Sequence, residues 1–149
     1  MENLFDAQTY ITIIARINTL KAESAPQWGK MNVAQMMCHT TKAFKVPLSD
    51  KRLPRLLIGR IFGSLIKHKL YNDVPWKKSI PTSPNLIVKD EREFENEKAE
   101  LLVHVNKFYA AGPTGISKFP HPMFGKFTPE QWGKNMYKHI DHHLTQFGV

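Results

Sequence analysis

Cysteine and long hydrophobic runs are nearly absent from this sequence of 149 residues. The single cysteine, Cys38, cannot form an intramolecular disulfide, which favours a reducing, cytoplasmic setting. No hydrophobic run approaches the ~20 residues that a membrane-spanning helix needs, so we expect no transmembrane segment. The N-terminal stretch MENLFDAQTY carries acidic residues and lacks the basic start of a signal peptide, so we expect no signal peptide.

Acidic residues are scarce relative to basic ones. The chain has 13 Asp and Glu against 21 Lys and Arg, a formal net charge of +8. Segment 51–78 holds eight of the basic residues but only one acidic residue, Asp73, a local excess of +7. No helix-turn-helix pattern accompanies this charge, so we do not expect a nucleic-acid partner. The segment is then the solvated edge of a helix, a dimer contact, a lid, or a patch that attracts an anionic substrate.

The alternation of polar and apolar residues that marks a half-buried strand is missing, except in the short run LIVK at 86–89. Apolar residues instead recur at steps of three and four, the period of an α-helix. The expected helices cover 5–22, the segment between Asn32 and Pro47, 53–70, the segment opened by Asp90 and Glu93, and Thr128 to Gly148. We predict one all-α domain over 1–149, a four-helix bundle with 53–70 as an extra helix between the second and third core helices.

Two of the expected helices begin with a capping box, in which the first and fourth residues satisfy each other's backbone N–H groups. Asn32 is followed by Gln35, and Thr128 is followed by Gln131 with Pro129 at the first helical position. These signals fix the start of the helix that carries His39 and of the helix that carries the C-terminal histidines.

The stretch KHIDHHLTQFG, residues 138–148, places three histidines within five residues. Each residue of an α-helix advances about 100°, so His139 and His143 lie about 40° apart on one face. Trp132 and Met136 fall on the same face, which the helix must bury. Two of the three histidines are therefore expected to point into the core.

The opposite, polar side of this helix is expected to carry three residues: Asn135, Lys138 and His142. His142 lies about 60° away from His139 on the side facing away from the apolar stripe. We therefore expect His142 to be solvated and not to take part in a buried site.

Paired histidines at this spacing have Cβ atoms about 6 Å apart, so both rings can reach one divalent cation. A third ligand must come from another helix, and His39, at the edge of an apolar face, is the candidate. Three neutral imidazoles and a water would form a metal site with an open position of the catalytic type. The alternative is that these are core histidines satisfied by hydrogen bonds, and spacing alone does not decide between the two.

Two further residues are weaker candidates for a catalytic role. His121 lies between two prolines in FPHPMFG, and the stiff backbone there suits a preorganised acid, base or fourth ligand. Gln146 lies about 20° from His139 around the helix and could hydrogen-bond a ligand or a metal-bound water. No Asp or Glu falls on the inward face of this helix, so the sequence identifies no general base.

At these residues the sequence resembles the DinB/YfiT-like superfamily of helical-bundle metalloproteins. The pattern is one His on the second helix, here His39, and His-x-x-x-His followed by Gln on the last, here His139, His143 and Gln146. The blocks PQWGKMNVAQMMCH and HPMFGKFTPEQWGKNMYKHIDHHLTQFG resemble a branch of that superfamily known only as a domain of unknown function. The superfamily's usual His-Arg-Gly-Gln ending is His-Leu-Thr-Gln here, which keeps the ligands and loses the arginine.

The resemblance implies an up-down-down-up four-helix bundle, a divalent metal ion (zinc or nickel) held by His39, His139 and His143, and a homodimer. It also implies a small-molecule substrate, since characterised relatives are transferases and isomerases that use low-molecular-weight thiols. We therefore expect a metal-dependent hydrolase or thiol-dependent S-transferase with no nucleic-acid or membrane partner. The first alternative is a non-catalytic bundle that binds metal or a small ligand. The second, less favoured alternative is a basic nucleic-acid-binding module.

Overall fold

The chain folds into helices joined by irregular segments, with no strand in the part that the structure describes. The structure is a computed structural model that describes the backbone of residues 1–149 and all side chains except those of Ile58 and Arg60. The elements are α1 (Ala7–Thr19), α2 (Val33–Phe44), α3 (Leu57–Ile66), the 3-10 helices η1 (Lys67–Leu70) and η2 (Pro84–Leu86), α4 (Phe94–Gly115) and α5 (Pro129–Gln146). The prediction of an all-α chain is confirmed.

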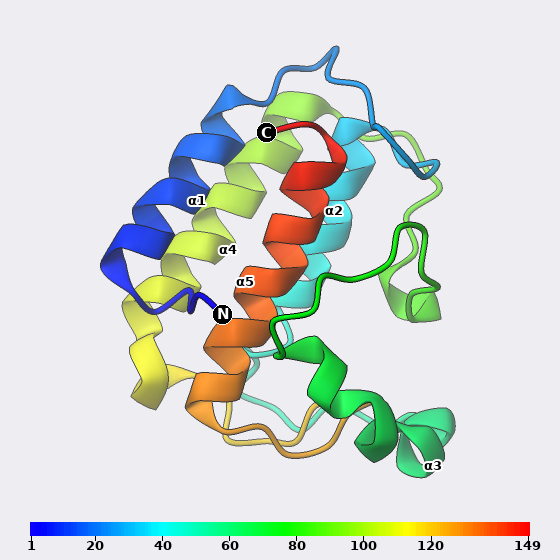
Figure 1. Ribbon diagram of the computed structural model, residues 1–149, viewed down its shortest axis with the longest axis vertical. Coiled ribbons are helices and arrows are strands. Elements are labelled where there is room, and N and C mark those ends of the chain that lie inside the picture. Colours follow the sequence, from blue (N-terminus) through cyan, green and yellow to red (C-terminus); the bar gives the residue numbers. More distant parts are fainter.

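The four longer helices α1, α2, α4 and α5 lie side by side (Figure 1). Helices α1 and α5 run in one direction, and α2 and α4 run in the other. Helices α1 and α2 lie diagonally across the group, and each contacts both α4 and α5. This arrangement is compatible with the up-down-down-up bundle that the resemblance implies, and it places α2 beside α5.

Large apolar side chains from all four of these helices meet in one core. The buried members are Ile13 and Ile17 of α1; Met36, Met37 and Phe44 of α2; Leu101, Val105 and Phe108 of α4; and Trp132, Met136, Ile140 and Leu144 of α5. Their spacing of three and four residues puts them on one face of each helix. Burying each such side chain contributes roughly 1.5–3 kcal/mol, so α2 and α5 are held firmly against each other and against α4.

Both predicted capping boxes are confirmed. The Asn32 side chain accepts a hydrogen bond from the Gln35 backbone N–H at 2.9 Å, and Gln35 Oε1 accepts from the Asn32 N–H at 3.1 Å. The Thr128 hydroxyl and Gln131 make the same reciprocal pair at 3.2 and 3.1 Å. The starts of α2 and α5 were therefore encoded locally.

The helix predicted over 53–70 is shorter than expected. It begins only at Leu57, after Pro54, and its last turn tightens into η1 at Lys67. Gly59 and Gly63 do not interrupt it, because they form the face that packs on the backbone of Met123. A methyl group at either glycine would overlap the Met123 carbonyl oxygen, so only glycine permits this close approach.

Two other helices differ in their boundaries from the sequence prediction. Helix α1 spans Ala7–Thr19 and not 5–22. Helix α4 begins at Phe94, with the Glu93 carboxylate accepting hydrogen bonds from the N–H groups of Glu95 and Asn96. Its regular part ends at Gly112, whose φ of 60° is unfavourable for other residues, and Pro113 follows. The run LIVK, the one stretch of the sequence with strand-like alternation, carries the end of η2 and an extended segment, in agreement with the all-α prediction.

Candidate metal centre

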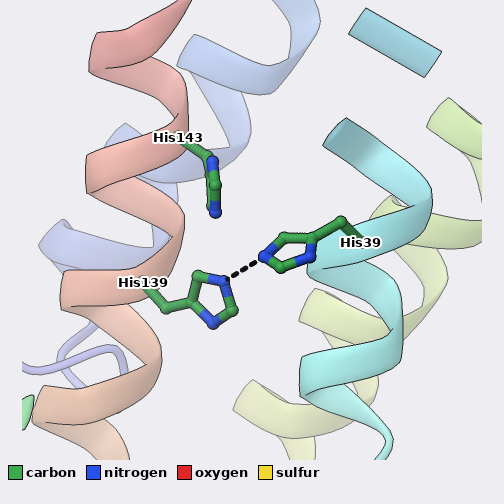
Figure 2. Close-up of side chains that lie close together, drawn as sticks. All are labelled: His39, His139 and His143. Atoms are coloured by element: carbon green, nitrogen blue, oxygen red, sulfur yellow. Dashed lines mark hydrogen bonds between the residues drawn. The ribbon is translucent and has the colours of Figure 1, made fainter. Parts of the chain in front are cut away.

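Three histidine side chains converge between α2 and α5 (Figure 2). His39 comes from α2, and His139 and His143 come from successive turns of α5. All three are buried, with exposed fractions of 3%, 8% and 7%. One ring nitrogen from each lies within 4.8 Å of those of the other two. The convergence predicted from the i, i+4 spacing and from the position of His39 is therefore confirmed.

The separations suit a single small cation. The Nε2 atoms of His39 and His139 lie 3.0 Å apart. The ring centroids of the three pairs lie 4.7, 5.0 and 5.1 Å apart. Zinc–imidazole bonds of about 2.0–2.1 Å at tetrahedral angles place neighbouring nitrogens about 3.4 Å apart.

Hydrogen bonds on the far sides of two rings fix which nitrogen faces the centre. His39 Nδ1–H donates to the Leu86 carbonyl oxygen at 2.9 Å, so its Nε2 carries a lone pair. His143 Nδ1–H donates to Gln146 Oε1 at 2.8 Å. The Gln146 amide is oriented in turn, because its Nε2 donates to the Trp28 carbonyl oxygen at 2.6 Å. Such outer partners normally set the tautomer and orientation of metal-binding histidines.

His139 is constrained differently. Since His39 keeps its proton on Nδ1, the 3.0 Å contact between the two Nε2 atoms requires His139 Nε2–H to donate to His39. No hydrogen bond to His139 Nδ1 is present among the residues that the structure describes. To hold a cation through Nε2, His139 would need its proton on Nδ1.

The electrostatic environment keeps all three imidazoles neutral. Burial lowers the pKa of His39 and lowers that of His139 well below its ordinary value. Burial, with a further contribution from His39, lowers the pKa of His143 to about 3. Metal ions bind the neutral form of imidazole, so at neutral pH the three rings are in the state that coordination requires.

Irregular segments cover the outer side of the three histidines. Leu86 of η2 and Trp28 supply the carbonyl oxygens described above. Trp76 lies with its ring centroid 5.7 Å from that of His139, and its indole N–H donates to the Lys69 carbonyl oxygen at 2.8 Å. Access to the site from solvent therefore passes these covering segments.

The prediction that His142 is solvated is wrong. Its ring is half-buried between the indoles of Trp28 and Trp76, with centroid distances of 5.7 and 5.6 Å. Burial lowers its pKa. His142 is not one of the three converging histidines, but it lies in the aromatic layer next to them.

The prediction of a polar, solvated side for α5 is also wrong for Asn135 and Lys138, both of which are buried. Lys138 Nζ donates three hydrogen bonds, to the carbonyl oxygens of Lys69 and Asn72 and to Asn72 Oδ1, at 2.7–2.8 Å. The polar face of α5 is covered by the segment that follows α3. Helical periodicity alone gives no information about such a covering segment.

His121 lies outside the cluster of three histidines. Its Nδ1 accepts hydrogen bonds from the backbone N–H groups of Met123 and Phe124 at 3.0 and 3.3 Å, and its ring packs on Trp132 at 5.5 Å. Burial lowers its pKa to about 4. These contacts give His121 a role in holding the 121–125 turn, and the catalytic role suggested for it stays a prediction.

Cys38 is a small buried side chain, and burial raises its pKa. It is not one of the residues that converge on the centre. Two participants, Leu86 and Trp76, were not predicted from the sequence. The only available signal was for Trp76, an aromatic residue in a proline-punctuated loop, and a backbone carbonyl such as that of Leu86 leaves no signal in a sequence.

A protein family described as "Protein of unknown function (DUF1569)" matches residues 5–148, and the chain belongs to this family. The match includes all three histidines. No curated protein matches the chain, and no solved structure matches it. The family description names no activity, and none of the comparisons links the chain to the DinB/YfiT-like superfamily.

Proposed function

We propose that this family member is a divalent-metal enzyme of the DinB/YfiT-like type, with the ion held by His39, His139 and His143. One observation carries the proposal: three buried, neutral imidazoles from two helices present ring nitrogens within 4.8 Å of one another. Two of the rings have their outer nitrogen occupied by an acceptor, which directs the inner lone pair to the centre. Three imidazoles suit zinc or nickel, and both prefer nitrogen ligands of this kind.

The chain's own residues would position the reaction. Leu86 and Gln146 hold the rings of His39 and His143, and Trp76 limits the access of water. Held by His39, His139 and His143, a divalent ion would supply Lewis acidity, which lowers the pKa of a water or thiol toward neutral pH. This chemistry fits a hydrolase or an S-transferase acting on a low-molecular-weight thiol. No carboxylate belongs to the cluster among the described residues, so we assign no general base.

A non-catalytic metal-binding role is the second candidate. It is favoured by the low exposure of the three histidines, 3–8%, and by the cover that Trp76 places over His139. A structural metal site is closed, whereas a catalytic one keeps a position open to a substrate.

The resemblance to the DinB/YfiT-like superfamily also suggests how the helices are organised and how the chains associate. We propose that α1, α2, α4 and α5 form the four-helix bundle of that superfamily, with α3 as the inserted helix. We also propose that the protein forms a homodimer and acts on a small molecule in the cytoplasm. Light scattering of the purified protein tests the dimer directly, and a monomer would remove that part of the proposal.

The metal content of the purified protein tests the site. Protein prepared without chelator should carry about one ion of zinc or nickel per chain, as a three-imidazole site implies. His143→Ala should lose the ion, and His68→Ala, which removes an exposed histidine on η1, should retain it. A metal-free wild-type protein that also fails to bind added zinc or nickel would eliminate both the enzymatic and the structural candidates.

Catalysis is tested separately from binding. Metal-loaded wild-type protein and His143→Ala are compared in hydrolase assays and in transfer assays with low-molecular-weight thiols. The enzymatic proposal predicts turnover by the wild type that is lost in the variant. Stoichiometric metal without turnover in any of these assays would favour the structural role.

A further inference from the structure

Helix α3 exposes a large apolar face. Five of its ten residues are bulky, apolar and 41–76% exposed: Leu57, Ile61, Phe62, Leu65 and Ile66. Leu57, Ile61 and Leu65 are spaced four residues apart and form one ridge along the helix. Soluble proteins rarely leave so many neighbouring apolar side chains in water unless the patch contacts a partner.

The anchoring of α3 explains why this face points outward. The glycine face of α3, Gly59 and Gly63, packs on the backbone of Met123, and the Leu56 N–H donates to the Pro122 carbonyl oxygen at 3.1 Å. Among the described residues α3 contacts none of the four long helices, and it projects away from them in Figure 1. The side with no bulky side chains faces the protein, so the bulky side chains are left on the other side.

Basic residues flank α3 on both sides in the sequence. Lys51 and Arg52 precede α3, and Lys67 and Lys69 follow it. The only acidic residue in 51–78 is Asp73, whose carboxylate pairs with the N-terminal amino group. The segment therefore combines an apolar ridge with an excess of positive charge that has little internal compensation.

The apolar ridge and the positive charge together favour one kind of binding partner. A second copy of the chain docked through the same face would bring two strongly basic segments together, which like-charge repulsion disfavours. A nucleic acid would neutralise the charge and leave the apolar ridge in water. An anionic lipid surface satisfies both, because apolar side chains enter the headgroup boundary while Lys and Arg contact lipid phosphates.

We propose that α3 and its flanking basic residues dock the protein on anionic lipid surfaces. The helix lies along the surface with Leu57, Ile61 and Leu65 inserted. It does not span the bilayer, since no described helix is long and apolar enough to do so. This departs from the expectation of no membrane partner. In its sequence, segment 53–70 spreads apolar residues around more than half of the helix and so lacks the clean polar face of a membrane-surface helix. That spread no longer argues against docking, because the glycine face is occupied by Met123.

Vesicle co-sedimentation of the full chain tests the proposal. The protein should bind vesicles containing phosphatidylglycerol and should bind pure phosphatidylcholine vesicles much more weakly, with binding that falls as salt is added. Ile61→Ser with Leu65→Ser should reduce the partition coefficient at least about tenfold. The matched control is Ile11→Ser with Val103→Ser, which alters exposed apolar residues on α1 and α4 and should leave binding unchanged.

A charge variant covers the case in which the apolar variant fails to fold. Lys51→Gln with Lys69→Gln should weaken binding about 10- to 30-fold, since each basic residue near an anionic surface contributes about 1 kcal/mol. Lys21→Gln with Lys107→Gln removes the same charge from exposed positions elsewhere and should have little effect.

Three results would overturn the proposal. One is equal binding to the anionic and the neutral vesicles, or no binding to either kind. Another is an equal loss of binding in the α3 variants and their matched controls. The third is a dimer in solution that dissociates only in Ile61→Ser with Leu65→Ser, which would assign the face to a second copy of the chain.

Discussion

At the scale of single residues, the orientation of the His143 ring depends on Gln146, which bridges it to the backbone of Trp28. Gln146→Ala removes the acceptor for His143 Nδ1–H and frees the ring to rotate. We expect the affinity for zinc to fall about 10- to 100-fold, the usual effect of losing an outer partner of a metal ligand. Competition with a chromogenic chelator measures this.

The control for this prediction is Gln8→Ala, which shortens an exposed glutamine on α1 and should bind zinc like the wild type. If Gln146→Ala also retains wild-type affinity, Gln146 does not orient a metal ligand.

A second prediction at this scale concerns the loss of folding stability at low pH that His121 causes. Its pKa is about 4 in the folded protein and about 6.5 in an unfolded chain, so between these values the unfolded state binds more protons. Stability is therefore full above pH 6.5 and falls as the pH is lowered toward 4. His121 should account for about 1–2 kcal/mol of the loss between pH 7 and pH 5.

Urea unfolding of metal-free protein at pH 7 and pH 5 measures this contribution. His121→Asn keeps an acceptor near the N–H groups of Met123 and Phe124 and removes the titrating group, so its stability should depend less on pH. Identical pH dependence in the variant and the wild type would contradict the assignment.

The residues that the sequence predicted well are those fixed by helical periodicity. His139 and His143 share a face because of their spacing, and apolar neighbours showed that this face is buried. Leu86 and Trp76 were not predicted, because they lie in the connections between the long helices, whose path depends on tertiary packing. The same covering segment buries Lys138, which periodicity alone assigns to solvent.

At the scale of elements, the start of α5 determines the register of two of the three histidines. Its capping box joins Thr128 and Gln131. Thr128→Ala should lower the free energy of unfolding by about 0.5–2 kcal/mol, and Thr128→Ser, which keeps the hydroxyl, should change it much less. Urea denaturation measures both. Equal losses in the two variants would show that the hydroxyl hydrogen bond contributes little.

The starts of α2 and α5 and the all-α class were predictable because capping residues and apolar periodicity are local properties of the sequence. Other helix boundaries were less predictable. The start of α3 at Leu57 and the kink at Gly112 depend on how the chain packs. The glycines of α3 in particular can be understood only once Met123 is seen against them.

At the scale of the whole molecule, the proposed ion would join α2 to α5, which lie about one hundred residues apart in the chain, as His39 and His139 show. A ligand that binds only the folded state stabilises it by about 4 kcal/mol at a free concentration one thousand times its dissociation constant. For a domain of this size the melting temperature should rise by roughly 8–15 °C.

Calorimetry with zinc and with chelator measures this shift. His143→Ala should melt at the same temperature in both conditions. A wild-type protein whose melting temperature does not respond to zinc would mean that no ion joins the two helices.

The most direct measurement is the X-ray absorption spectrum of the metal-loaded protein at the metal edge. We expect three imidazole nitrogens at about 2.0–2.1 Å from a zinc ion, and one further light atom. A spectrum with fewer than three imidazoles, or with a sulfur ligand from Cys38, would contradict the site built from His39, His139 and His143.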